Sequence, residues 1–147
     1  MAGARDDLLT AALAVFDQDG FEGATVAAIR ERAGASNGSF FHFFNSKREL
    51  AGTLFLELLR RYHIAMLDVI DPPPGAEEGI ARLIRTHLDW VVNNRREANF
   101  LFEISRSEWA QDVRDARKAR NATVAEGVEA WRAPLVASGD LLPMKAS

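Results

Sequence analysis

The sequence contains no cysteine, three histidines and no long apolar run. The absence of cysteine excludes disulfides and cysteine-ligated zinc or iron-sulfur sites, and it fits a reducing cytosol. No uninterrupted apolar stretch approaches the roughly 20 residues that span a bilayer, and the N-terminus lacks the basic, apolar and small-residue pattern of a signal peptide. We therefore expect a cytoplasmic protein with no membrane partner.

Patterns that carry catalysis are also missing. The chain has no H-E-x-x-H, G-x-S-x-G or phosphate-loop motif, so no nucleophile and base, or metal set, can be assembled from it. Asp68 and Asp71 follow His63 closely in sequence, but without a second cluster this proximity supports a metal site only weakly. We predict that the protein is not an enzyme and uses no metal or cofactor.

The pattern that is present is helical. At 147 residues, with 48% apolar and 27% charged side chains, the chain has the size and composition of a globular unit with one main core. Leu9, Ala12, Leu13 and Phe16 fall at i, i+3, i+4 and i+7, which places them on one face of a helix. Because no segment alternates with the two-residue period of a strand, the sequence predicts an all-α fold.

Helix start and stop residues divide the first fifty positions. Gly20 and Gly34 are expected to end two helices, since glycine takes the left-handed stop conformation at little cost. Thr25 and Ser36 are N-cap residue types, and an S-x-x-E capping box begins at Ser46. The sequence thus predicts three short helices followed by a long one.

The later part of the chain continues with helices. The fourth helix is expected to run to Asp71, where three prolines, residues 72–74, interrupt it. A helix over roughly 97–105 should place Phe100 and Phe102 on different faces, and a last helix should end near Ser138. The most regular apolar stripe lies between these segments: Ile80, Leu83, Ile84, His87, Leu88, Val91 and Val92.

Short helices joined by a turn that contains Gly34 form the outline of a helix-turn-helix. In this motif the second helix of the pair enters the major groove and presents its first residues to base edges. Those residues are short and polar here, with one glycine that lets the backbone approach DNA: Ser36, Asn37, Gly38 and Ser39.

The segment over residues 19–55 resembles the N-terminal domain of the tetracycline-repressor (TetR) family. The family pattern has a glycine turn, a threonine-capped helix, Ala-Gly-Val-Ser, a glycine, an aromatic-His-Phe run and a lysine before a long helix. The residues at matching spacing are Gly20, Thr25, Ile29, Ala33, Gly34, Ala35, Ser36, Gly38, Phe41, Phe44, Lys47 and Leu50. The resemblance implies a helix-turn-helix domain over 1–46 and a helical ligand-binding and dimerisation domain over 47–147.

The resemblance also implies roles for individual residues. Side chains at Thr25, Ser39, Phe41 and Lys47 would lie against phosphates, while Asn37 and His42 would face the groove. Phe41 replaces the family's usual tyrosine and so lacks a phosphate-directed hydroxyl, and Arg30 stands where a small alanine is common. For His42, packing against Phe44 or the long helix is an equally open alternative.

By the same resemblance, the second domain would bind a small, apolar effector and pair two copies of the chain. Its candidate pocket residues are His63, Met66, His87, Trp90, Phe100, Arg106, Trp109 and Trp131. The alternatives are purely structural roles: His87 is then a partly buried histidine that contacts no ligand, and the tryptophans only fill the core. Relatives usually continue through one more long helix and dimerise through the last two, so the chain is expected to stop where that final helix would begin.

Charge is the main argument against DNA binding. The net charge is −3, and residues 1–61 hold seven basic against eight acidic side chains, a net of −1. Helix N-termini can bind phosphate without formal charge, so this balance does not exclude a regulator that represses transcription from a palindromic operator as a homodimer. The alternative is a helical small-molecule-binding or protein-interaction module that no longer binds DNA. A positive ridge around the third helix would favour DNA, and an even mixture of charge would favour the alternative.

Overall fold

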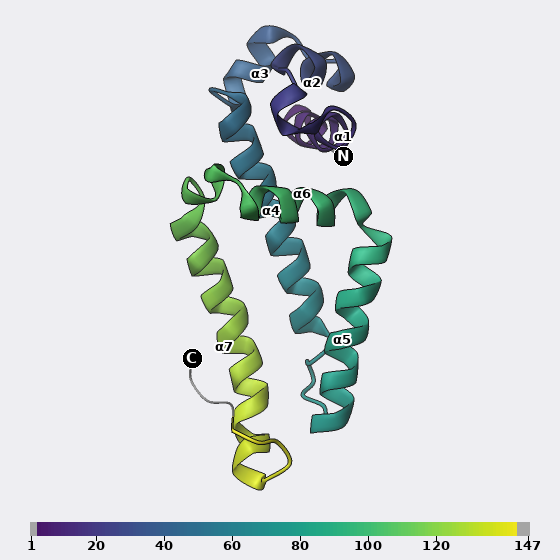
Figure 1. Ribbon diagram of the computed structural model, residues 1–147, viewed down its shortest axis with the longest axis vertical. Helices are drawn as coiled ribbons and strands as arrows, with labels where there is room; N and C mark the ends of the chain where they lie inside the picture. The colour runs from purple at the N-terminus through teal and green to yellow at the C-terminus, as the bar shows by residue number, and fades with distance from the viewer. Residues whose placement is uncertain (1–2, 144–147) are drawn as a thin grey trace. The chain divides into compact units, whose positions relative to one another are not determined.

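The computed structural model of the protein describes residues 3–143. Over that range its helices are joined by turns and loops, and there is no strand (Figure 1). The predicted all-α fold is confirmed. The elements are α1 (Ala4–Gly23), α2 (Val26–Ala33), α3 (Asn37–Phe43), α4 (Lys47–Asp68), α5 (Ala76–Asn93), α6 (Arg95–Arg106), the 3-10 helix η1 (Glu108–Gln111) and α7 (Arg114–Ser138). Within the described range, no helix has the length and apolar character needed to cross a membrane.

The chain divides into two compact units. The first comprises Met1–Leu58 and Asn94–Arg114, and the second comprises Leu59–Asn93 and Asp115–Ser147. This division by packing differs from the expected domain boundary at residues 46/47, because α6 and η1 pack with the N-terminal helices and the first half of α4 does so too. The assignment of DNA binding to 1–46 and of ligand binding and dimerisation to 47–147 remains a functional proposal.

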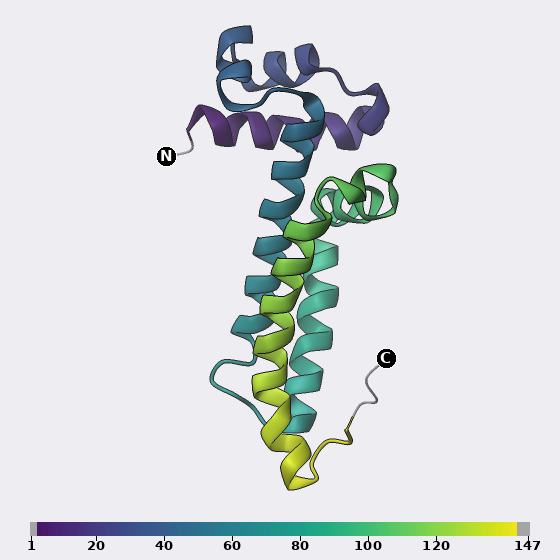
Figure 2. The ribbon, with the colours of Figure 1, turned by 90° about the vertical axis from the view of Figure 1, so that its left-hand side faces the viewer.

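In the first unit, α2 and α3 lie together on one side of α1 (Figure 2). Their shared core is formed by fully buried apolar side chains, among them Leu8, Ala12, Ile29, Phe40, Leu50 and Ala51. The Phe16 ring of α1 stacks on Phe100 of α6 at a centroid distance of 5.4 Å, and Asp17 accepts an ion pair from Arg96 at 3.2 Å. The same unit therefore holds the three short helices and the later helix α6.

Two glycines break the helices of this unit where the sequence predicted. Gly20 has φ 71° and interrupts α1, which resumes for one short turn to Gly23. Gly34 ends α2 with φ 66° and ψ 28°, the left-handed conformation that glycine adopts most readily.

The predicted N-caps are also present. Oγ1 of Thr25 and Oγ of Ser36 each accept the backbone N–H three residues later, at 3.0 and 3.1 Å. Oγ of Ser46 accepts the N–H of Glu49 at 3.0 Å, but the Glu49 carboxylate reaches the N–H of Asn45 rather than that of Ser46. The start of α4 is thus capped reciprocally, with the return bond shifted by one residue.

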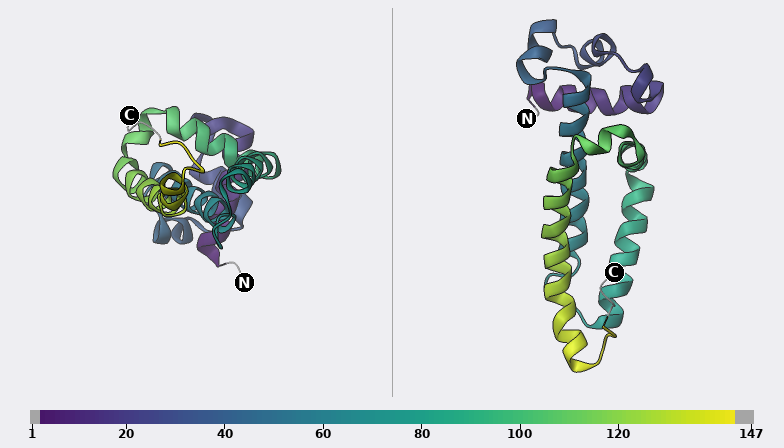
Figure 3. Two further views of the ribbon diagram at one scale, coloured as in Figure 1. Left: turned by 90° about the horizontal axis from the view of Figure 1, so that it is seen from below. Right: turned by 60° about the vertical axis from the view of Figure 1, so that its left-hand side comes forward.

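In the second unit, α5 and α7 lie on either side of the later half of α4 (Figures 1 and 3). Trp131 of α7 is buried, and its Nε1–H donates to the carbonyl of Pro74 at 2.9 Å. The Trp131 ring lies directly against the backbone of Gly79 in the first turn of α5. A close helix contact is therefore built on a glycine that the apolar periodicity of α5 did not single out.

We expect Gly79→Ala to lower the free energy of unfolding by about 1–3 kcal/mol, because the added methyl would overlap the Trp131 ring and force α5 and α7 apart. Urea unfolding followed by the helical circular dichroism signal measures this loss. The matched control is Gly23→Ala, whose new methyl would meet only Cβ of Asp19 at 3.7 Å. A Gly79→Ala protein at least as stable as the wild type would contradict the contact.

The later boundaries differ from expectation only in detail. The fourth helix ends at Asp68, so the predicted end at Asp71 was three residues late. The residue before a proline is disfavoured in the α conformation, and the turns preceding Pro72 therefore replace the last part of the helix. On α6, Phe100 is 4% exposed and Phe102 is 61% exposed, which confirms that they lie on different faces.

Candidate nucleic-acid interface

Helix α3 has one anchored face and one exposed face. Phe40 and Phe44 are 0% and 2% exposed and hold the helix against the rest of the first unit. The opposite face presents side chains or backbone from Asn37, Gly38, Phe41 and His42, with Phe41 50% exposed and Ser39 half-buried. The structure therefore gathers on one surface the residues of α3 that the sequence assigned to DNA.

His42 is exposed and its ring lies beside Phe43, with centroids 4.8 Å apart. This ring contact of His42 is therefore with its neighbour in the chain and not with Phe44. A position at the end of a seven-residue helix leaves the imidazole free to approach a base edge or a phosphate.

Three helices of the first unit begin with a hydroxyl cap. Thr25, Ser36 and Ser46 precede α2, α3 and α4, and all three are exposed. A helix N-terminus carries several backbone N–H groups without intrahelical acceptors, and a cap satisfies only one or two of them. The remaining N–H groups suit phosphate oxygens and require no basic side chain.

The Lys47 ammonium is engaged inside the protein. Its Nζ donates to the carbonyls of Phe21 at 2.8 Å and Ala24 at 3.0 Å, with Glu22 at 3.5 Å, and it lies 4.5 Å from the centroid of the Phe21 ring. These carbonyls belong to the turn that follows the break at Gly20. Lys47 thus ties the start of α4 to the end of α1, a role that the sequence pattern did not indicate.

We expect Lys47→Met to lower the free energy of unfolding by roughly 1.5–3 kcal/mol, the usual range for losing hydrogen bonds to a charged donor. The same variant separates the two roles of this side chain when operator binding is measured at several salt concentrations. A decrease of about 0.9 in the magnitude of the negative slope of log K against log salt would assign a phosphate contact to Lys47. An unchanged slope would mean that Lys47 only holds the start of α4 to the end of α1.

The neighbouring cation is also paired. The Arg48 guanidinium forms a hydrogen-bonded ion pair with Asp112, just after η1, and lies 4.8 Å from the centroid of the Trp109 ring. The hydrogen bond to Asp112 raises the pKa of Arg48, and the same bond lowers the pKa of Asp112. Since Trp109 also contacts Phe21 edge-on, η1 is held against both α1 and α4.

Two other arginines of this unit also lie against the protein. Arg5 pairs with Asp6 and lies over the Phe44 ring, and Arg30 is half-buried with its Nε lacking a hydrogen-bond partner. Arg30 therefore packs where a smaller residue would fit, as the comparison with the family pattern anticipated. Near α3 and the start of α4 the exposed side chains carry both signs of charge: Glu31, Arg32, Arg48 and Glu49.

The eight predicted effector residues are divided between the two units. Phe100, Arg106 and Trp109 belong to the first unit, and in this structure Arg106 lies over the exposed ring of Phe102. The other five belong to the second unit: His63, Met66, His87, Trp90 and Trp131. Phe100 and Trp109 serve contacts with α1 and α4, which sequence periodicity could not distinguish from a pocket lining.

Part of the second group does come together around Tyr62, which the sequence analysis missed. The Tyr62 hydroxyl is 2.9 Å from Nδ1 of His87, and its ring lies edge-on to Trp90 at 5.1 Å and beside His63 at 5.9 Å. Burial raises the pKa of Tyr62; burial, followed by the charge of Arg120, lowers the pKa of His63. The cluster joins α4 to α5 with polar atoms in a largely apolar setting.

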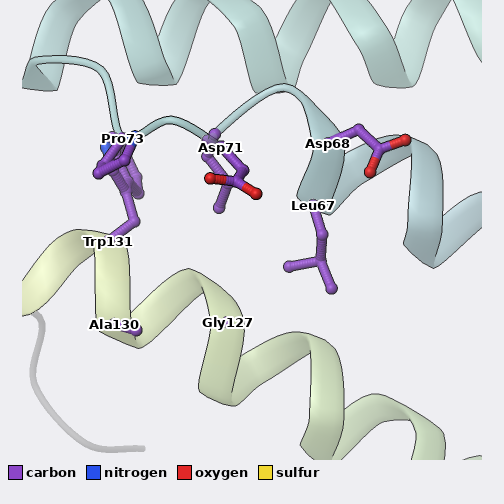
Figure 4. A pocket seen from close by; sticks show the side chains of 8 residues that line it. Leu67, Asp68, Asp71, Pro73, Gly127, Ala130 and Trp131 are labelled. Carbon is purple, nitrogen blue, oxygen red and sulfur yellow. The ribbon is translucent and has the colours of Figure 1, made fainter.

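A pocket of about 350 Å³ lies between the end of α4, the following loop and α7 (Figure 4). Leu67, Pro73 and Trp131 supply apolar surface, while Asp68 and Asp71 place carboxylates on it. Trp131 is the one predicted effector residue that lines this pocket. Within residues 3–143, no group of three or more acidic or histidine side chains is placed to hold a metal ion.

The geometry of α1 to α4, with a tight turn at Gly34 and an anchored, outward-facing α3, is that of a helix-turn-helix protein with an appended helical domain. Residues 8–54 match the sequence model of the bacterial regulatory proteins of the tetR family. The match covers the helix-turn-helix part of the chain, and the chain is similar to this family there.

Curated relatives and solved structures agree. The chain is 34% identical over 94 residues to the HTH-type transcriptional repressor AcnR of Corynebacterium diphtheriae, covering 60% of this chain and 45% of that protein. It is 35% identical over 74 residues to the HTH-type transcriptional regulator BetI of Yersinia pestis, covering 46% of this chain and 37% of that protein. The chain thus spans less than half the length of these curated relatives.

A tetR family transcription regulator from Shewanella sp. PV-4 superimposes with a TM-score of 0.78 and 27% identity, over 90% of this chain and 72% of that one. A second, from Marinobacter aquaeolei VT8, gives a TM-score of 0.77 over 92% of this chain and 70% of that one. Its 20% identity shows a shared fold only. Both matches extend well beyond the helix-turn-helix and include the helices of the second unit.

Proposed function

We propose that the chain is a DNA-binding transcriptional regulator that represses transcription by occupying a palindromic operator as a homodimer. The observation that carries the proposal is the two-sided α3. Buried Phe40 and Phe44 fix the helix, and its exposed face presents Asn37, Gly38 and His42. The AcnR relatives are named repressors, which favours repression over activation.

Recognition would combine base contacts with phosphate contacts. Asn37 and His42 supply hydrogen-bonding groups for base edges, and Gly38 allows close approach of the backbone. Ser36, Ser39 and Thr25 would meet phosphates together with the N–H groups they cap, and the Phe41 ring would pack on sugar and backbone. With few free cations, affinity per copy should be modest, so two copies on one palindrome are needed for tight binding.

The regulatory signal would be a small molecule bound in the second unit. The pocket between α4 and α7 offers Trp131 and Leu67 to an apolar body, and Asp68 and Asp71 favour an effector that also carries a positive group. The chain passes from α5 directly into α6, and α6 packs on α1 through Phe100. A shift of α6 would therefore move α1 and change the spacing of the two recognition helices.

The test is selection of genomic fragments by the purified protein, followed by titration of the best fragment at two salt concentrations with the mass of the complex recorded. Salt-dependent enrichment of one palindrome by two copies is expected. Binding that ignores sequence, or no enrichment at all, would overturn the proposal.

One observation favours a second function. Lys47 and Arg48 are both engaged within the protein, so the mixed charge near α3 also suits a helical module that binds a small molecule or another protein and no longer binds DNA. Fragment selection distinguishes the two, because only the regulator enriches a sequence.

A further inference from the structure

An ion pair joins the start of α4 to the connection between η1 and α7. The Arg48 guanidinium donates from Nε to Oδ2 of Asp112 and lies 4.8 Å from the centroid of the Trp109 ring. The two partners are 64 positions apart in the sequence, and their side chains are 42% and 41% exposed. Both ends of this contact are therefore open to solvent and to a competing partner.

Arg48 lies in the first turn of α4, close in the chain to the recognition helix. Helix α3 ends at Phe43, and only residues 44–46 separate it from α4. Ser46, which caps α4, is exposed and precedes Arg48 by two positions. Because the arginine side chain is long and flexible, its guanidinium can reach a phosphate held near this cap.

The two adjacent cations of α4 differ in how firmly they are held. Lys47 is half-buried, and its Nζ donates to two carbonyls at 2.8 and 3.0 Å, which would lose these bonds if the lysine left. Arg48 and Asp112 are both exposed, so water can replace each partner when the pair opens, and a pair of this kind contributes little to stability. Of the two cations, Arg48 is the one that can exchange its partner.

Acidic side chains next to Arg48 balance its charge. Asp112 hydrogen-bonds to it, and Glu108 at the start of η1 adds a second negative charge nearby. The hydrogen bond lowers the pKa of Asp112, so this carboxylate stays ionised at neutral pH and continues to attract the guanidinium. A phosphate that approaches the α4 cap therefore meets an arginine whose charge is already neutralised.

DNA phosphate is the partner whose chemistry competes with this carboxylate. The planar N–H groups of a guanidinium match a phosphate and a carboxylate equally well, with two parallel hydrogen bonds. Binding to DNA also releases a condensed counterion, which an internal carboxylate does not do. The exchange of Asp112 for a phosphate is therefore favoured at low salt and disfavoured at high salt.

We propose that Arg48 is a further phosphate-binding residue and that Asp112 is an internal competitor that withholds it from DNA. This role rests on the proposed function and adds to it a contact that the sequence pattern did not assign, together with the residue that opposes it. Asp112 directly follows η1, which joins α6 to α7. A shift of this connection that draws Asp112 away would free Arg48 and raise the affinity for DNA.

Titration of the full chain with its selected fragment at several salt concentrations tests the competition. Asp112→Asn keeps the shape of the side chain and removes its charge. We expect it to tighten binding by about fivefold at the lowest salt and to increase the magnitude of the negative slope of log K against log salt by about 0.9, the value for one added phosphate contact. Both effects should disappear when Asp112→Asn is combined with Arg48→Met.

The matched control is Asp115→Asn, which removes the same charge from an exposed residue in the first turn of α7. It separates the release of Arg48 from a general loss of negative charge, and it should leave affinity and slope nearly unchanged. Circular dichroism should show all variants folded, because Arg48, Asp112 and Asp115 are exposed.

An Asp112→Asn protein that binds DNA with the same or lower affinity would overturn the inference, because Asp112 would then only hold the start of α4 in place. Tighter binding with an unchanged slope, an equal gain in Asp115→Asn, or a gain that persists without Arg48 would overturn it as well. If neither the wild type nor Asp112→Asn enriches any fragment, the proposed function fails too. Normal binding by the wild type with no gain in Asp112→Asn removes only the role of Asp112 and Arg48.

Discussion

Replacing Phe40 with alanine is expected to lower the free energy of unfolding by about 3–5 kcal/mol, the range for removing a buried phenyl group. Phe40 is fully buried, and its ring lies 5.9 Å from that of Phe44. These two rings are the attachment of a helix of only seven residues, too short to be stable without packing. Since the free energy of unfolding of a typical domain is about 5–15 kcal/mol, the loss is a large fraction of the total stability.

Urea unfolding of Phe40→Ala measures the loss, and Phe41→Ala is its control. The two residues are adjacent and chemically identical, but Phe41 is 50% exposed, so its removal should change stability by about 0.5 kcal/mol or less. Equal losses at the two positions would mean that α3 is not oriented as described, and the assignment of its outer face would fail with it.

Local signals explain why the N-terminal helices of the first unit could be predicted from sequence. The breaks at Gly20 and Gly34 depend on backbone conformations that glycine adopts most readily, and the caps at Thr25 and Ser36 depend on hydrogen bonds that span three residues. Such interactions are complete within a few residues. The order and the ends of the first helices follow from them.

The interactions that sequence reasoning missed join residues far apart in the chain. Lys47 reaches carbonyls 23 to 26 positions earlier, and Arg48 pairs with an aspartate 64 positions later. From sequence, a lysine at the start of a helix is equally compatible with a phosphate contact and with hydrogen bonds to carbonyls of a distant part of the chain. Only the path of the chain after Gly20 decides which acceptors lie within its reach.

Helix α5 shows the same limit in another form. Periodicity predicted one apolar stripe that included Leu83 and Leu88, but Leu83 is half-buried whereas Leu88 is 57% exposed. What decides the inward face is Gly79, which admits the Trp131 ring, and Tyr62 of α4. Because glycine is not counted in an apolar pattern, the inward face of α5 could not be predicted from that pattern.

The division of the predicted effector residues has a similar cause. Aromatic residues at helical spacing fill cores and line pockets alike, and composition does not separate the two uses. Phe100 and Trp109 pack on aromatic rings of the N-terminal part and so join α6 and η1 to it. Those contacts connect the later part of the chain to α1 and to the start of α4.

Gly38→Ala is expected to raise the stability of the protein and to weaken its binding to DNA. Gly38 is the second residue of α3, has no positive φ, and would place a Cβ no closer than 4.0 Å to any neighbouring atom, Oγ of Ser36. The fold therefore does not require glycine here. Alanine in a helix is more favourable than glycine, so the free energy of unfolding should rise by about 0.5–1 kcal/mol.

Operator affinity should fall at the same time, because in the proposed complex the new methyl would lie between the α3 backbone and the groove. We expect a loss of about tenfold, or 1.4 kcal/mol, measured by fluorescence anisotropy with the selected fragment. Gly23→Ala is the control: it adds a methyl to the same unit outside α3, where the methyl meets only Cβ of Asp19 at 3.7 Å, and it should leave affinity unchanged. If Gly38→Ala binds the fragment as tightly as the wild type, the α3 backbone does not approach DNA closely at this position. If both alanine variants lose affinity equally, the effect does not come from the groove-facing surface of α3.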